Sequence, residues 1–274
     1  TEHLPMFDDQ ALLTSPEFDG AYVAAEKFTE ALGRRVRSAG FMKSMMLQRI
    51  CSSFASGLST ARKLLNKLPA GDEEEETFFA DVNAAMSSSD AALEPAGIEA
   101  ERHHLQAIID WLERKPTDPK LDAVLHFLNE RKWLDLGCII FSQYFDTAYW
   151  VAECLTKELP GERVALYAGA DKSGLFFSGE WRSVEREDIK RAVRDRTIRL
   201  VVATDAACEG LNLQTLGTLI NVDLPWNPSR LQQRIGRIQR FGQTRDRVDM
   251  LNLVYKDTRD EKVYAALSKR MRDR

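Results

Sequence analysis

The sequence has few of the residues and runs that mark specialised classes of protein. Only 4 of its 274 residues are cysteine, and none of them forms a Cys-x-x-Cys pair. The adjacent His103 and His104 have no second pair at ligand spacing, so we expect no zinc site and only scattered, reduced cysteines. No apolar run approaches the ~20 residues of a membrane span, and the N-terminus has no basic-then-apolar signal pattern. These absences predict an intracellular, cytoplasmic protein with no membrane partner.

A phosphate-binding loop of the Walker A type is also missing. Its pattern GxxxxGK[ST] needs a glycine followed by a lysine, and the chain contains no Gly-Lys dipeptide. An acidic run begins at Asp72, but the segment LPAG at residues 68–71 cannot be a buried strand in front of it. We therefore interpret the run as the acidic N-terminus of a helix rather than as the ligands of a magnesium ion.

What the sequence does contain is typical of a globular protein. Apolar residues make up 44% and charged residues 29% of the chain, and the net charge is 38 − 42 = −4. The charge is unevenly spread. Residues 1–30 carry seven acids and one lysine, residues 71–100 carry nine acids and no base, and residues 228–247 carry six arginines and one aspartate. The mildly acidic total therefore conceals a local basic stripe suited to an anionic partner.

The apolar pattern divides the chain into two parts. Residues 1–116 show the three-and-four spacing of helices and no convincing strand. Helices are expected over residues 21–68, from Asp72 through Phe79, and over residues 98–114. Because this segment is acidic, it suits a scaffold or a protein partner better than direct contact with phosphates.

Residues 117–274 alternate between short apolar runs and helical stretches. This alternation predicts right-handed βαβ units and an α/β domain with a mostly parallel sheet. The stretch Asp171–Trp181 receives no role. The expected strands are residues 138–141, 163–167, 198–203, 219–222 and 248–255. The expected helices are residues 119–128, 146–159, 180–195, 228–240 and 260–272.

Polar segments follow three of these units, at the sheet edge where such folds bind ligands. They are residues 141–143, 203–214 and 233–243. In the last segment, Gln233, Arg237 and Arg240 are spaced i, i+4 and i+7, so they share one helix face. Two guanidinium forks on one face suit phosphate oxygens and could stabilise a transferring phosphoryl group. Taken alone, this helix is more simply a solvated basic face.

Together, in order and spacing, the three segments resemble motifs IV, V and VI of the superfamily 2 helicases. The similarity is strongest to the Swi/Snf-like ATPases, particularly their bacterial branch, and covers about residues 117–270. Residues 47–53 resemble, more weakly, the helical lead-in to the second lobe of such proteins. The matching text is Phe141-Ser142-Gln143, Thr204-Asp205-Ala206, Glu209-Gly210-Leu211-Asn212-Leu213-Gln214, Asp223-Leu224-Pro225-Trp226-Asn227-Pro228, Gln233-Arg234-Ile235-Gly236-Arg237 and Arg240-Phe241-Gly242-Gln243.

The resemblance implies a RecA-like, three-layer αβα lobe at residues 117–274, preceded by an all-helical segment at residues 1–116. It implies that Arg237 and Arg240 are catalytic arginine fingers. It places Glu209, Gly210, Asn212 and Gln233 near bound ATP, whose Mg²⁺ would be held mainly by a first lobe that this sequence lacks. The residues that match contacts to the nucleic-acid backbone are Ser142, Gln143, Gly169 and Thr204.

We therefore expect the C-terminal lobe of an ATP-dependent DNA translocase or helicase, nucleoid-associated if the source is bacterial. Its expected partners are double-stranded DNA and the N-terminal RecA-like lobe of the same native protein. Alone, this chain should bind ATP weakly and hydrolyse none.

Two other readings stay open. An RNA helicase lobe is disfavoured by Leu213-Gln214 and by the segment DLPW at residues 223–226. A non-catalytic nucleic-acid or protein interaction module is disfavoured because Arg237 and Arg240 are both retained.

Overall fold

The structure is a computed structural model. It describes residues 11–34, 39–66, 95–114, 118–169, 171–205, 214–225, 228–238 and 248–272. The chain forms two compact units. One is the segment Thr14–Asp118, and the other joins Pro119–Arg274 to the N-terminal stretch that ends at Leu13. In this second unit Leu12 forms an isolated parallel bridge with Tyr255.

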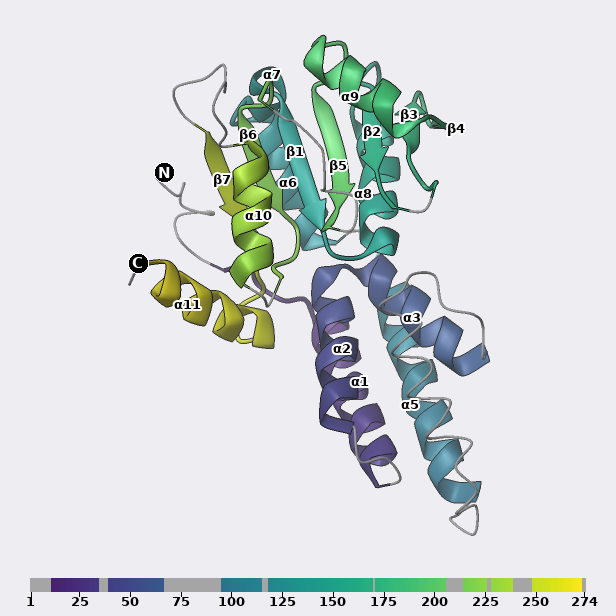
Figure 1. Ribbon diagram of the computed structural model, residues 1–274. Coiled ribbons are helices and arrows are strands. Elements are labelled where there is room, and N and C mark those ends of the chain that lie inside the picture. Colours follow the sequence, from purple (N-terminus) through teal and green to yellow (C-terminus); the bar gives the residue numbers. More distant parts are fainter. Residues whose placement is uncertain are drawn as a thin grey trace. The chain divides into compact units, whose positions relative to one another are not determined.

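The described part of the first unit is helical (Figure 1). Its elements are α1 (Pro16–Gly33), α2 (Ala39–Ser52), α3 (Phe54–Asn66) and α5 (Pro95–Glu113). The helical pattern predicted over residues 21–68 is confirmed for the described residues there, and the chain divides it among α1, α2 and α3. The helix expected from Asp72 lies outside the described residues.

Capping side chains explain why α3 is a separate helix. Ser53 Oγ accepts a hydrogen bond from the backbone N–H of Ser56 (3.0 Å), as an N-cap residue does. Asp118 Oδ2 accepts another from the backbone N–H of Phe54 (2.8 Å). These two donors belong to the first turn of a helix, where no carbonyl of the same helix can reach them.

The second unit contains a seven-stranded sheet in the order β4-β3-β2-β5-β1-β6-β7. Strands β2, β5, β1, β6 and β7 are parallel, and β3 and β4 are antiparallel additions at one edge. The expected α/β fold with a mostly parallel sheet is confirmed. The strands are β1 (Cys138–Ser142), β2 (Val164–Tyr167), β3 (Gly174–Phe177), β4 (Glu180–Ser183), β5 (Leu200–Thr204), β6 (Thr218–Asn221) and β7 (Asp249–Asn252).

Helices cover both faces of this sheet and make three layers (Figure 1). Successive residues of β1 are all buried, because Ile140 belongs to the core under α6 and α8 while Ile139 and Phe141 belong to the core under α9 and α10. The covering helices are α6 (Pro119–Asn129), α8 (Phe145–Glu158), α9 (Arg186–Arg194) and α10 (Pro228–Ile238). The remaining helices are α7 (Trp133–Leu136) and α11 (Arg259–Arg272).

The expected helix over residues 180–195 begins too early. Residues 180–183 form strand β4, and the helix α9 starts at Arg186. Ser178 and Gly179 join β3 to β4 with positive φ values of 51° and 83°, as a two-residue hairpin turn requires. The Trp181 ring lies 4.7 Å from that of Phe176 and 5.8 Å from that of Tyr149. These ring contacts stabilise residues 180–183 as strand β4. The spacing of apolar residues in the local sequence does not reveal them.

Candidate functional site

Three strands bring their polar ends together at one edge of the sheet. In the register, Ser142 of β1 lies opposite Thr204 of β5, and Phe141 lies opposite Asn221 of β6. The chain leaves β6 and enters α10 after only a few residues, so the first turns of α10 stand near the same edge (Figure 1). Sequence segments that are about 80 residues apart thereby share one small region.

Arg234 of α10 is the central side chain of this region. It is 1% exposed, and its guanidinium binds both carboxylate oxygens of Asp205, with Nε–Oδ1 at 2.5 Å and Nη2–Oδ2 at 2.8 Å. Its Nη1 donates to Asn221 Oδ1 (2.9 Å) and to the backbone carbonyl of Asp223 (2.8 Å). The guanidinium also lies 5.4 Å from the centre of the Phe141 ring. Such planar, bidentate bonding fixes α10 against the ends of β5 and β6.

Asp223 connects the same guanidinium to the loop after β1. Its Oδ2 accepts a hydrogen bond from Ser142 Oγ (2.5 Å), and its Oδ1 accepts one from the backbone N–H of Gln143 (2.8 Å). Oδ1 also lies 3.5 Å from Arg234 Nη2. The Gln143 side chain donates from Nε2 to the carbonyl of Leu224 (3.1 Å). The loop after β1 is thus bound to the segment after β6.

A second basic side chain lies close to this network. Lys120 is fully buried, and its Nζ donates to the carbonyl of Val222 (2.5 Å), next to Asp223. Buried polar and charged groups need such hydrogen-bond partners, because no water reaches them.

The structure places the predicted nucleic-acid contacts as follows. Gln143 is half-buried, whereas Ser142 and Thr204 are 1% and 4% exposed at the ends of neighbouring strands. The Ser142 hydroxyl is occupied, since it donates to Asp223 and its oxygen accepts from the backbone N–H of Tyr144 (3.1 Å). These three residues lie together, and their roles stay predictions.

Gly169 follows β2, which pairs with β5 on the side away from β1. It is half-buried, and its carbonyl accepts a hydrogen bond from the backbone N–H of Lys172 (3.1 Å). Its role also stays a prediction.

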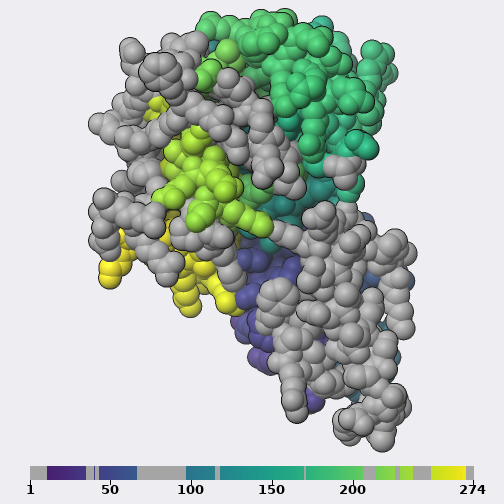
Figure 2. All heavy atoms as spheres, viewed as in Figure 1, coloured from purple at the N-terminus to yellow at the C-terminus, as the bar shows by residue number. Residues whose placement is uncertain are grey.

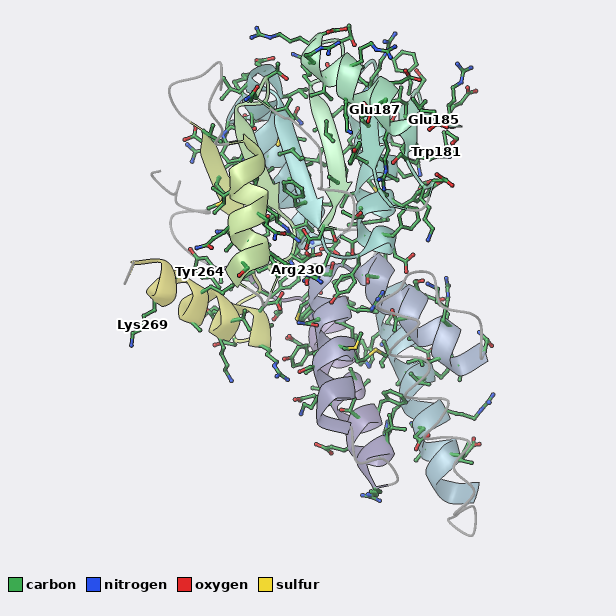
Figure 3. All side chains as sticks on the ribbon, viewed as in Figure 1. Trp181, Glu185, Glu187, Arg230, Tyr264 and Lys269 are labelled. Atoms are coloured by element: carbon green, nitrogen blue, oxygen red, sulfur yellow. The ribbon has the colours of Figure 1, made fainter. Side chains whose placement is uncertain are left out.

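The predicted ATP contacts fall mostly on residues that the structure does not describe. Gln233 is exposed on α10. Arg237 belongs to the same helix. Part of α10 reaches the face of the molecule shown in Figure 2, where it is yellow-green, and Arg230 of its first turn is labelled in Figure 3. The predicted residues outside the described part of the chain are Glu209, Gly210, Asn212 and Arg240.

The buried charges that organise the site were not among the residues predicted from the sequence. A signal for them exists. Successive helix residues are 100° apart, so a helix that exposes Gln233 and buries its other side turns Arg234 inward. A buried arginine needs carboxylates, and Asp205 and Asp223 each stand directly or nearly directly after a buried strand. Lys120 carries no comparable signal, because Pro119-Lys120 reads as an ordinary helix start.

Within the described part of the chain, no group of three or more His, Cys, Asp or Glu residues is placed to hold a metal ion. Over those same residues, we find no helix whose length and apolarity would let it cross a membrane.

Comparison with known proteins identifies relatives. Residues 119–242 match the family model of the helicase conserved C-terminal domain. Over 163 residues the chain is 32% identical to the uncharacterized ATP-dependent helicase YqhH of Bacillus subtilis, covering 60% of this chain and 26% of that protein. Over 123 residues it is 31% identical to the RNA polymerase-associated protein RapA of Vibrio parahaemolyticus, covering 38% of this chain and 12% of that protein. The chain thus spans about a quarter or less of either relative.

Two solved structures share the fold. The C-terminal part of the Fun30 ATPase domain superimposes with a TM-score of 0.53 at 15% identity, covering 93% of this chain and 86% of that one. The Pyrococcus furiosus Hef helicase domain gives a TM-score of 0.53 at 16% identity, covering 94% and 56%. At these identities the likeness concerns the fold alone.

Proposed function

We propose that this chain is the C-terminal RecA-like lobe of a superfamily 2 helicase with Swi/Snf-like relatives in bacteria, and that it forms half of an ATP-driven motor on double-stranded DNA. The other half is an N-terminal lobe with the phosphate-binding loop that this sequence lacks. Such a motor would work in the cytoplasm, on the nucleoid if the source is bacterial.

The orientation of α10 is the observation that carries this proposal. Arg234 points into the sheet and is held there by Asp205. At 100° per residue, Gln233 lies 100° to one side of Arg234, and Arg237 lies 60° to the same side. Positions 233 and 237 therefore share one flank of the helix, and fixing Arg234 sets the direction of that flank. A flank held so rigidly can direct guanidinium groups at a phosphate without reorganising during the reaction.

In the proposed mechanism, closure of the two lobes brings Arg237 and Arg240 to the γ-phosphate of ATP. The arginines stabilise the charge that spreads over the transferring phosphoryl group, and hydrolysis lets the lobes reopen. Glu209, Gly210 and Asn212 would line the nucleotide, with Gln233 beside them.

Magnesium is assigned to the other lobe. Both carboxylates of the described site are already engaged, since Asp205 and Asp223 bind Arg234. When bound there with ATP, Mg²⁺ would neutralise charge on the phosphates.

We assign the contacts with DNA to the polar residues at the ends of the strands. Gln143, Thr204 and Gly169 would contact one strand through phosphate and sugar, which gives binding without sequence preference. Because the Ser142 hydroxyl already bonds Asp223 and Tyr144, the part of Ser142 would be to hold the loop that presents Gln143. Repeated closure would step this lobe along the duplex.

The test uses the protein that carries both lobes. Replacing Arg240 by alanine should reduce ATP turnover by about 10³-fold or more, the usual contribution of an arginine finger. Binding of a DNA duplex, measured by fluorescence anisotropy, should stay unchanged. Arg230→Ala, on the same helix, is the control and should retain turnover. Wild-type turnover in the Arg240 variant would refute the finger assignment, and stronger stimulation by RNA than by duplex DNA would favour an RNA helicase.

A further inference from the structure

One carboxylate touches both parts of the site. The two oxygens of Asp223 accept hydrogen bonds from Ser142 Oγ and from the N–H of Gln143, which belong to the predicted DNA-contacting loop. The same carboxylate lies 3.5 Å from Nη2 of Arg234, which orients the predicted arginine-finger helix. The Asp223 side chain is therefore shared between two elements that the proposed function gives different tasks.

Asp205 provides a natural comparison. It forms the stronger ion pair with Arg234, at 2.5 and 2.8 Å. Among the described residues its carboxylate bonds Arg234 alone. Asp205 and Asp223 thus hold the same guanidinium, but only Asp223 also holds the loop after β1.

The backbone around Asp223 is fixed on both sides. Lys120 Nζ binds the carbonyl of Val222, and Arg234 Nη1 binds the carbonyl of Asp223. A displacement of the Gln143 backbone therefore acts on Asp223 through its carboxylate, which accepts the Gln143 N–H, while the Gln143 side chain separately bonds the carbonyl of Leu224 (3.1 Å). The carboxylate is only 3% exposed, so water cannot replace a partner that it loses.

We propose that Asp223 is a positioning residue that couples DNA contact at the loop after β1 to the setting of α10. When DNA binds Gln143 and displaces the loop, the Asp223 carboxylate shifts its hydrogen bonds between the loop and Arg234. The orientation of α10, which contains Arg237, changes as a result. Packed polar networks pass on such a shift because their members have few alternative arrangements. This inference rests on the proposed function and adds the route by which DNA stimulates hydrolysis.

The experiment measures ATP turnover of the two-lobed protein with and without duplex DNA. Asp223→Asn should lower the ratio of stimulated to unstimulated turnover by about tenfold, the size of a typical coupling between sites. Asp205→Asn is the matched control. It weakens the hold on Arg234 without touching the loop, so it should lower both rates together and leave the ratio within about twofold. A purely structural role for Asp223 would give the control's result.

Two outcomes separate the inference from its premise. A DNA-stimulated wild type with an unchanged ratio in Asp223→Asn overturns the coupling alone. A wild type that no duplex stimulates overturns the proposed function together with the coupling.

If Asp223→Asn fails to fold, a double-mutant cycle between Ser142→Ala and Arg234→Lys takes its place, because these residues meet through Asp223. Effects on the ratio that depart from additivity by about fivefold or more support the coupling, and additive effects overturn it.

Discussion

At the scale of single residues, the buried charged side chains of the α/β unit fix the orientation of the helix α10. Arg234 is covered on every side and satisfies its donors with Asp205, Asn221 and the backbone of Asp223. A buried ion pair adds little net stability compared with an apolar replacement of the whole set, but loss of one partner is costly. Such a cluster specifies one orientation of α10, which the proposed chemistry needs.

Replacing Arg234 by methionine tests this argument. The change leaves the buried carboxylate of Asp223 and the half-buried carboxylate of Asp205 without their guanidinium, so the free energy of unfolding should fall by ~3–5 kcal/mol. Arg230→Met, at an exposed position of the same helix, should change it by no more than ~0.5 kcal/mol. Urea unfolding of both variants measures the difference. Equal losses would show that Arg234 has no special structural part.

Cys138 gives a prediction about pH. Burial raises the pKa of its thiol from 9.0 to about 12, and a hydrogen bond with Thr218 opposes this rise in part. Below pH 9 the thiol is protonated in both states and contributes no pH dependence. Above pH 9 the unfolded chain loses a proton that the native chain keeps, so stability falls as pH rises, by up to ~1.4 kcal/mol per pH unit.

The variant Cys138→Ala isolates this contribution. Its urea midpoint should lose less between pH 8 and pH 10 than the wild-type midpoint does, because one ionising group has been removed from the unfolded chain. Parallel curves for the two proteins would contradict the assignment. The same raised pKa predicts that iodoacetamide leaves Cys138 of the folded protein unlabelled at pH 8, as peptide mapping by mass spectrometry would show.

At the scale of elements, helix starts and strand contacts decide where the pattern of the sequence is broken. Ser53 and Asp118 begin α3 inside a stretch whose apolar period runs on. Trp181 belongs to a strand because Phe176 and Tyr149 surround it. In both places the apolar period predicts a continuous helix. The structure that forms instead depends on one capping side chain or on groups that lie far away in the sequence.

The cap of α3 can be tested by Asp118→Ala. Asp118 is 1% exposed, and its removal leaves the N–H of Phe54 without its carboxylate acceptor. The expected cost is ~0.5–2 kcal/mol in the free energy of unfolding, as for other caps. Asp110→Ala, which removes an exposed carboxylate that accepts from Gln106 Nε2 (2.8 Å), is the control and should be near neutral. Similar midpoints in a urea titration would argue against a capping role.

At the scale of the whole molecule, the chain is one unit whose described residues are helical and one lobe with a RecA-like fold. Its relatives are far longer, since it covers 26% and 12% of their lengths. The proposed ATP hydrolysis needs a phosphate-binding loop, and the sequence contains no Gly-Lys dipeptide to supply one. The proposed activity is therefore a property of two lobes.

The corresponding prediction concerns the chain alone. Purified residues 1–274 should bind ATP weakly and release no phosphate above background, with or without duplex DNA. The reason is that these residues contain no phosphate-binding loop to hold the γ-phosphate. A sensitive phosphate-release assay checks this. Turnover by the isolated chain that disappears in Arg237→Ala would overturn the assignment of hydrolysis to two lobes.

The sequence by itself determined the α/β alternation and the five central strands, because buried parallel strands leave local signatures. The polar segments after the strands carried the resemblance to the superfamily 2 helicases. It also identified the arginine helix through its i, i+4 and i+7 spacing. Only the tertiary structure decided how that helix is turned. Asp205, Asp223 and Lys120 come from distant segments, and each looks ordinary until the fold brings it to Arg234 or the adjoining backbone. The physical reason is that pairing of buried charges depends on proximity in space, which the local period of a sequence does not encode.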